Sequence, residues 1–320
     1  MADTKISNLT SGAPDQTGDA LPIARSGANY KLTLADFFTA DEHPTYSKFD
    51  DQSTVPSPPA SGIQLFCFPQ GGRRLPFFQG PSGIESAVNP AFFANNVTMW
   101  MCGTGATAAI NFGVNWTIGG TQTTPAIANT NFMTAMKRGV FTSGTSGGSI
   151  AGVLSAAAIC WIGSAAGKGG FFFAARFGVT TFASDMKIFC GLTALSTALA
   201  GDPSAMANSC GVSKDAADTN WQCITVNATP SATKIDSTRA VQAGGTTDVF
   251  DFYMFCKPNG TTITFRFEDI ASGTVYVSEQ GQTNTLPANN VMLYAHCEAL
   301  NTTSGAIAIF LNKLYIESDT

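Results

Sequence analysis

The most regular feature of the chain is the alternation of apolar and polar residues in short runs. In Thr264-Phe265-Arg266-Phe267-Glu268, the two phenylalanines fall on one face of an extended strand and Arg266 on the other. This alternation is typical of an antiparallel strand with one buried face. Runs rich in aromatic or β-branched residues recur at 63–68, 96–103, 108–116, 170–182, 186–192, 222–227, 249–258, 261–269, 274–280, 291–299 and 306–318.

Turn-forming residues separate most of these runs. Clusters of Gly, Pro, Asn, Asp, Ser or Thr stand between them, and Pro258-Asn259-Gly260 predicts a hairpin turn because Asn-Gly accepts a positive φ. Many strands with such turns predict an all-β body, a β-sandwich or a jelly-roll-like fold, over residues 63–320. A possible sub-boundary lies near 142–168.

Helix signals are few in this body. Residues 132–138 and 155–159 predict short helical turns, with weaker signals at 184–186 and 204–207. The sequence holds no heptad stretch, so it predicts no coiled-coil stalk.

The N-terminal part has a different pattern. Residues 19–38, DALPIARSGANYKLTLADFF, predict one small hairpin, which is marginal in water by itself. Residues 46–62 are rich in Pro, Ser and Asp and predict a linker or extended arm. We therefore expect an N-terminal segment, 1–45, that is separate from the body.

One strand carries large apolar side chains on both faces. Neighbouring residues of a strand point to opposite faces, so Phe171-Phe172-Phe173 places aromatic rings on each. One face can meet the partner sheet, and the other needs a loop, a helix or another subunit to cover it. The candidates for a subunit interface are Phe171, Phe172, Phe173 and Phe177.

The low charge of the chain favours association. Only 12% of the residues are charged, against about 25% in a typical soluble domain. We expect a homo-oligomer, because a soluble monomer needs charged surface. The net charge of −5 and the scattered Lys and Arg argue against nucleic-acid binding. The longest strongly apolar run, 169–177, is too short to cross a bilayer, and no signal peptide is visible.

Motifs for a metal, a cofactor or a nucleophile are weak. The eight cysteines form no C-x-x-C pair and mostly lie in apolar runs, so we expect structural thiols, no metal and no cofactor. Two short stretches resemble motifs of trypsin-like proteases: GTSGGS at 144–149 and YAHC at 294–297. His296 follows Ser146, however, and lies in an apolar strand, so a Gly/Ser loop and a packed histidine are the better interpretation.

Carboxylates and tryptophans are the remaining candidates for glycan chemistry. A glycosidase needs two carboxyl groups at a set separation, and we expect most candidate carboxylates to be solvated. They are Asp185, Asp251, Glu268, Asp269, Glu279 and Glu298. Three tryptophans near turns are candidates for stacking on sugars, with core packing as the alternative: Trp116, Trp161 and Trp221.

The first 38 residues resemble the N-terminal segment of many bacteriophage tail fibres, tailspikes and related virion appendages. The body is similar to C-terminal domains of tail-fibre-like phage proteins in NPAFFANNVTMWMCGTG, AAINFGVNWT, GGFFFAARFGV, NSCGVSKDAADTNWQ and LYIESD. The matching N-terminal residues are Lys5-Ile6-Ser7, Leu9, Thr17-Gly18-Asp19, Leu21-Pro22-Ile23, Gly27, Lys31, Thr33, Asp36 and Phe37.

This resemblance implies a trimeric, β-rich protein of the virion, assembled in the host cytoplasm. The expected function is a tail fibre or receptor-binding protein that contacts other virion proteins and a host-surface glycan or protein; a head fibre, decoration or adaptor protein and a glycan hydrolase or lyase are the alternatives. Residues with a virion-anchoring role would be Ile6, Leu9, Leu21, Ile23, Tyr30, Leu32, Leu34 and Phe37.

Overall fold

The computed structural model describes residues 20–25, 28–33, 56–70, 73–81, 85–87, 96–103, 109–165, 168–242 and 247–318. They belong to two compact units, Met1–Asp50 and Asp51–Thr320, which we describe one at a time.

The first unit contains the two strands of the predicted hairpin. β1 (Ala20–Arg25) pairs with β2 (Ala28–Thr33) in an antiparallel register that sets Leu21 opposite Leu32 and Ile23 opposite Tyr30. The pairing of these strands is confirmed. Four of the expected anchoring residues lie outside the described residues: Ile6, Leu9, Leu34 and Phe37.

The second unit is a β-sandwich of two antiparallel sheets, which confirms the all-β fold. The nine-stranded sheet has the order β19-β18-β17-β12-β21-β10-β9. Two strands share the same edge of β21: β10 pairs with its first half and β6 with its second half. β7 pairs with the other edge of β6. Its strands are β6 (Asn96–Cys102), β7 (Ala109–Phe112), β9 (Thr121–Thr123), β10 (Gly139–Thr142), β12 (Phe171–Thr181), β17 (Phe250–Cys256), β18 (Ile263–Asp269), β19 (Thr274–Gln282) and β21 (Ala308–Ser318).

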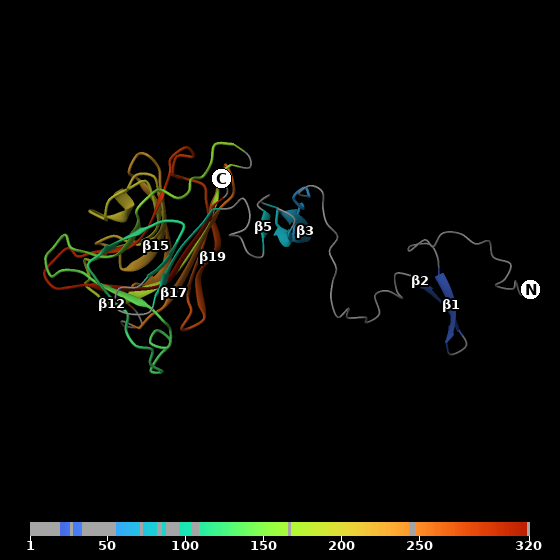
Figure 1. Cartoon of the computed structure of the whole chain (residues 1–320), viewed down its shortest axis with the longest axis horizontal. Helices are drawn as coiled ribbons and strands as arrows, with labels where there is room; N and C mark the ends of the chain where they lie inside the picture. Colours follow the sequence, from blue (N-terminus) through green and yellow to red (C-terminus); the bar gives the residue numbers. More distant parts are fainter. Residues whose placement is uncertain are drawn as a thin grey trace, which may run out of the picture. The chain divides into compact units, whose positions relative to one another are not determined.

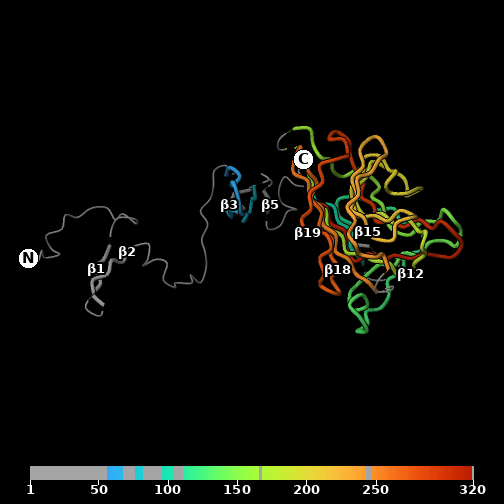
Figure 2. The backbone as a smooth tube through the Cα atoms, turned by 180° about the vertical axis from the view of Figure 1, so that it is seen from behind, coloured from blue at the N-terminus to red at the C-terminus, as the bar shows by residue number. Residues whose placement is uncertain are grey.

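The seven-stranded sheet has the order β16-β15-β14-β13-β20-β11-β8. Its strands are β8 (Trp116–Gly119), β11 (Ile150–Ser155), β13 (Lys187–Thr193), β14 (Ser209–Lys214), β15 (Asn220–Val226), β16 (Ala232–Ala240) and β20 (Tyr294–Leu300). Figure 1 shows β12, β17 and β19 in one layer and β15 in the other. From behind, β19, β18 and β12 follow one another in their sheet order (Figure 2).

A third, three-stranded sheet precedes the sandwich in the sequence. It consists of β3 (Gln64–Gln70), β4 (Arg73–Gln79) and β5 (Glu85–Ala87), in that order. Phe66 and Phe77 stack across β3 and β4 with ring centroids 5.6 Å apart, and both are buried.

The core between the two large sheets is aromatic. Trp221 of β15 lies 5.5 Å from Phe177, 5.4 Å from Phe250 and 6.0 Å from Phe267, measured between ring centroids. These three phenylalanines come from β12, β17 and β18 of the opposite sheet, so the cluster joins the layers. Burying each such ring is worth about 2–3 kcal/mol relative to leaving it exposed.

This core corrects several of the sequence-based expectations. Phe171, Phe173 and Phe177 are fully buried between the sheets, so they are not available to another subunit. Trp116 and Trp221 are also core residues, because the alternation of their strands turns them inwards, and they cannot stack on a sugar. Trp161 is half-buried.

Two irregular segments cover parts of the outer faces. Residues 195–206, with the short 3-10 helix η3 (Pro203–Ala205), place Leu199 and Met206 on the outer face of the seven-stranded sheet. On the nine-stranded sheet, Met133 packs against Phe310 of β21. Of the predicted helical turns, the one at 132–138 is a single hydrogen-bonded turn, in which the Ala135 amide donates to the Asn131 carbonyl oxygen at 3.1 Å. The one at 155–159 is wrong, because these residues form the end of β11 and a bend.

Arg138 shapes the segment over Phe310. The buried guanidinium donates hydrogen bonds to the carbonyl oxygens of Met133, Thr134 and Met136 at 3.2–3.4 Å. These hydrogen bonds satisfy carbonyl groups at the end of the turn, where no further helical residue follows to do so. The loop thus covers one end of the nine-stranded sheet, and the site described below lies at the other end.

Candidate functional site

Outward-facing aromatic rings form a platform on the nine-stranded sheet. Phe172 lies on β12, between Phe171 and Phe173, which are buried; Tyr253 and Tyr315 alternate with buried residues of β17 and β21 in the same way. The Phe172 ring centroid is 6.3 Å from Tyr253, stacked at 23°, and 6.3 Å from Tyr315, edge-on at 62°. All three rings are half-buried, so each keeps some surface for a ligand.

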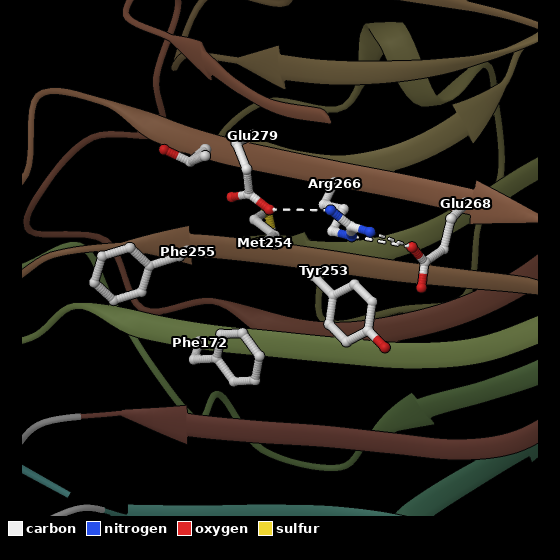
Figure 3. A pocket seen from close by; sticks show the side chains of 8 residues that line it. Phe172, Tyr253, Met254, Phe255, Arg266, Glu268 and Glu279 are labelled. Atoms are coloured by element: carbon white, nitrogen blue, oxygen red, sulfur yellow. Dashed lines mark hydrogen bonds and ion pairs between the residues drawn. The ribbon is translucent and has the colours of Figure 1, made fainter. Parts of the chain in front are cut away.

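A pocket of about 310 Å³ opens beside this platform. The register explains why its residues meet, since Phe255 pairs with both Phe172 and Thr264, and Tyr253 pairs with Arg266. Figure 3 shows the rings on neighbouring strands and a row of charged side chains above them. The pocket is lined by Phe172, Tyr253, Met254, Phe255, Thr264, Arg266, Glu268 and Glu279.

One arginine sits between two carboxylates at the rim. Nε and Nη2 of Arg266 donate hydrogen bonds to Oε2 of Glu268 at 3.0 and 2.7 Å, and Nη1 lies 3.7 Å from Oε1 of Glu279 (Figure 3). The hydrogen bond with Glu268 is the main cause that raises the pKa of Arg266, with the charges of Glu268 and Glu279 adding to it. The other oxygen of Glu268 has no hydrogen-bond partner in the part of the chain that the structure describes.

A β-bulge places Glu279 at the pocket. Phe265 pairs with Gln280 and Phe267 with Val277, so two residues of β19, Ser278 and Glu279, stand opposite Arg266. Glu279 has a φ of +48°, which costs energy for a residue other than glycine. Bulges often turn a side chain toward a functional site, and here the Glu279 side chain is 67% exposed.

A second ion pair supports the platform. Nε and Nη2 of Arg176 donate to the two oxygens of Asp251 at 2.7 Å each, and the Tyr253 hydroxyl donates to Oδ2 of Asp251 at 3.0 Å. Burial, followed by the charge of Asp251 and this hydrogen bond, raises the pKa of Tyr253 to about 12. The phenol therefore remains protonated around neutral pH and holds its ring in a fixed orientation.

These groups are chemically suited to hold a polar ligand. Aromatic rings pack against the C–H face of a polar ligand, and carboxylate oxygens accept hydrogen bonds from its hydroxyl groups. Within the described residues, no group of three His, Cys, Asp or Glu could hold a metal ion. The described residues also include no helix long and apolar enough to span a membrane.

The serine–histidine constellation is not assembled. His296 is fully buried, and its nitrogens contact Oε2 of Glu298 at 2.8 Å and the carbonyl oxygen of Leu195 at 2.9 Å. The packed histidine is therefore confirmed. Ser146 lies in an exposed loop that Asn301 holds through the carbonyl oxygens of Gly144 and Ser146.

The expectation of solvated carboxylates is wrong for half of the candidates. Asp251, Asp269 and Glu298 are buried because each has a positively charged or hydrogen-bonding partner: Arg176, Arg239 and His296. Glu268 and Glu279 are the two that reach a pocket. The cysteines behave as expected, since all but Cys67 are buried, and burial raises the pKa of Cys256 to about 12.

A second hollow, of about 520 Å³, lies at the outer face of the seven-stranded sheet. Its walls come from residues 197–200 and from the ends of β11, β13 and β20. The only charged side chain among its lining residues is Lys187, which pairs with Asp202 at 3.3 Å. No aromatic side chain is among the residues that line this hollow.

The fold and the site together define an all-antiparallel β-sandwich with an aromatic, carboxylate-rimmed site on an outer sheet face. No family model and no curated protein matches the chain.

Solved structures are similar only at low identity. A protein of unknown function from Shewanella oneidensis MR-1 has 14% identity and a TM-score of 0.48, covering 71% of this chain and 87% of that one. The lectin UEA-II, solved with galactose, has 15% identity and a TM-score of 0.44, covering 70% and 98%. Arcelin-5, a lectin-like defence protein from Phaseolus vulgaris, has 8% identity and a TM-score of 0.44, covering 71% and 99%. Similarities this low say nothing about function.

Proposed function

We propose that this chain is a receptor-binding structural protein of a bacteriophage virion, which binds a host-surface saccharide on the outer face of its nine-stranded sheet. The observation that carries the binding function is the platform of Phe172, Tyr253 and Tyr315 beside a pocket whose rim is a carboxylate–arginine–carboxylate row. Stacking and hydroxyl recognition are the two interactions by which a protein holds a sugar ring.

The virion part of the proposal rests on the first unit. Its paired strands contain Leu21, Ile23, Tyr30 and Leu32, which belong to the segment that resembles phage appendages. A two-stranded sheet is marginal by itself, so it gains stability from the surface to which it attaches. We propose a tail fibre, with a head fibre, decoration or adaptor protein as the alternative location. Immunogold labelling of particles distinguishes tail from head.

We further propose a homotrimer. The exposed side chains of Met101 and Phe112, on the neighbouring strands β6 and β7, and the 12% of charged residues favour a partner of the same kind. Light scattering of the purified protein at micromolar concentration should give three times the chain mass, and a dissociated monomer would contradict the trimer.

The saccharide proposal is tested with variants of the platform. Phe172→Ala should weaken binding to immobilised bacterial surface saccharides by about tenfold or more, because it removes the central ring. Phe132→Ala removes an aromatic ring that is 47% exposed outside the site and serves as the control. The proposal would be contradicted if Phe172→Ala and Phe132→Ala bound equally well. It would also be contradicted if the wild-type protein and both variants all failed to show saturable binding.

A glycan-degrading enzyme is the second candidate, because Glu268 and Glu279 flank the same pocket. Glycoside hydrolysis needs one carboxyl group as an acid and one as a base or nucleophile, whereas both of these contact Arg266. Release of reducing sugar from a bound saccharide, abolished by Glu268→Gln, would favour the enzyme over the binding protein.

A further inference from the structure

The charge of the rim discriminates among saccharides. One guanidinium, that of Arg266, faces two carboxylates, so the rim carries one net negative charge.

The two arginines of this face already have carboxylate partners. Arg266 uses Nε and Nη2 on Glu268, and Arg176 uses Nε and Nη2 on Asp251, which is only 2% exposed. Nη1 of Arg266 has no hydrogen bond among the described residues but lies 3.7 Å from Oε1 of Glu279, so a carboxylate that approaches it meets the negative charge of Glu279. Bidentate or shared arginine–carboxylate pairs are among the stronger polar contacts in proteins.

The accessible polar groups are mainly acceptors. A carboxylate accepts hydrogen bonds and donates none, and Glu279 is 67% exposed while one oxygen of Glu268 has no partner among the described residues. Groups that suit these oxygens are the hydroxyl groups of a sugar. The left-handed φ of Glu279 shows that the chain accepts backbone strain to bring one of these acceptors to the pocket.

We infer that the site selects neutral saccharides and rejects those with a carboxylate, and that Glu279 is the residue that determines this specificity. The inference rests on the proposed saccharide binding. Neutral sugar hydroxyls donate to Glu268 and Glu279 while the ring packs on Phe172 and Tyr253. A uronic acid brings a negative charge to within a few ångströms of Glu279.

The test compares neutral methyl hexopyranosides with the corresponding methyl hexuronates. Calorimetry or fluorescence titration of the full chain measures both affinities. For each hexopyranoside that binds, the corresponding hexuronate should bind at least about tenfold more weakly at low salt. The difference should shrink as salt is raised, because screening weakens an exposed charge interaction.

Glu279→Gln separates charge from shape. The amide retains an acceptor, so the neutral glycoside should bind within about threefold of the wild type, while the discrimination against the uronate should fall severalfold. Asp185→Asn makes the same charge change outside the site and should leave the discrimination unchanged. Circular dichroism verifies that each variant is folded, and Glu279→Ser is a second neutral variant.

The outcomes separate the two proposals. If the wild type binds neutral and acidic sugars equally, or if Glu279→Gln and Glu279→Ser leave the discrimination intact, the selectivity is wrong and saccharide binding stands. If none of the methyl hexopyranosides and none of the methyl hexuronates binds, the proposed function is wrong, and the selectivity is wrong with it.

Discussion

His296 and Glu298 form a buried pair that ties an irregular segment to the seven-stranded sheet. Oε2 of Glu298 contacts Nδ1 of His296 at 2.8 Å and accepts a hydrogen bond from the Leu199 amide at 3.1 Å, while Nε2 of His296 reaches the Leu195 carbonyl oxygen. Nε2 donates to that carbonyl, since a carbonyl oxygen only accepts. Two residues of β20 thus satisfy two backbone groups of the segment 195–199.

Removing this carboxylate should therefore destabilise the fold. Glu298→Ala leaves Nδ1 of the imidazole and the Leu199 amide without partners in the interior, and we expect a loss of about 3–5 kcal/mol in the free energy of unfolding. Urea denaturation measures this loss. Asp185→Ala removes a half-buried carboxylate whose oxygen accepts only a long hydrogen bond, from the Thr303 hydroxyl at 3.5 Å, so it should cost far less, and equal effects would contradict the role of the pair.

Asp215 gives the protein a dependence on acid. Burial raises its pKa, but hydrogen bonds from Lys234 and Ser204 and the charge of Lys234 outweigh burial, so the pKa lies below the usual 3.8. A folded-state pKa below the unfolded one stabilises the fold above about pH 4, and this contribution disappears as the pH falls through the folded value.

Lys234→Met tests this dependence. Lys234 contacts Asp215 at 2.7 Å, so the variant should be less stable than the wild type at pH 6 by about 1 kcal/mol. The difference should narrow between pH 4 and pH 2, as seen by denaturation at each pH. Lys234 also contacts Asp218 at 2.8 Å, so a difference that stays constant or widens on acidification would show that neither carboxylate paired with Lys234 is responsible.

At the scale of elements, the bulge in β19 connects backbone strain with the site. Glu279→Gly should raise the free energy of unfolding by about 0.5–1 kcal/mol, because glycine adopts a positive φ without strain. The same variant should bind the neutral saccharide more weakly. Glu279→Ala also removes the carboxylate but keeps the strain, so it should be less stable than the glycine variant; the opposite order would contradict a strained Glu279.

Most long strands follow from the sequence alone. The run around Phe265 alternates strongly, those around Phe172 and Tyr253 are rich in aromatic residues, and the Asn259 turn has the expected positive φ of 52°. β14 gives no such signal, because Ser209, Ser213 and Lys214 are polar. It is buried as a central strand between β13 and β15, and Lys214 donates to four carbonyl oxygens.

The site follows from the sequence only in part. Alternation places Arg266 on an outer face and sets Phe172 on the face opposite to Phe171 and Phe173, and the two rim carboxylates are among the candidate carboxylates. Their meeting depends on the strand order β19-β18-β17-β12 and on the bulge opposite Arg266, which are set by pairing between distant segments. Trp116 and Trp221 lie near turns in the sequence but face inwards, so proximity to a turn does not identify the sugar-stacking groups.

At the scale of the whole molecule, the chain divides into an N-terminal unit, Met1–Asp50, and a larger one that contains the sandwich. The large core belongs to residues after Asp51, and the paired strands β1 and β2 belong to the N-terminal unit. Such a division suits a protein in which one part attaches to a particle and the other binds a receptor.

Deletion of residues 1–45 should accordingly leave a folded protein. We expect its thermal unfolding and its saccharide binding to match those of the full chain, while a phage that carries only the truncated gene should lack the protein on purified particles. Western blotting of those particles measures incorporation. Incorporation at the full-length level would contradict attachment through the N-terminal unit.

The most direct test of the central claim is a crystal structure of the protein with a neutral saccharide that it binds. The account predicts a sugar ring packed on Phe172 and Tyr253, with hydroxyl groups about 2.7–3.0 Å from carboxylate oxygens of Glu268 and Glu279. A sugar held instead in the hollow beside residues 197–200 on the seven-stranded sheet, with the Phe172 platform empty, would contradict it.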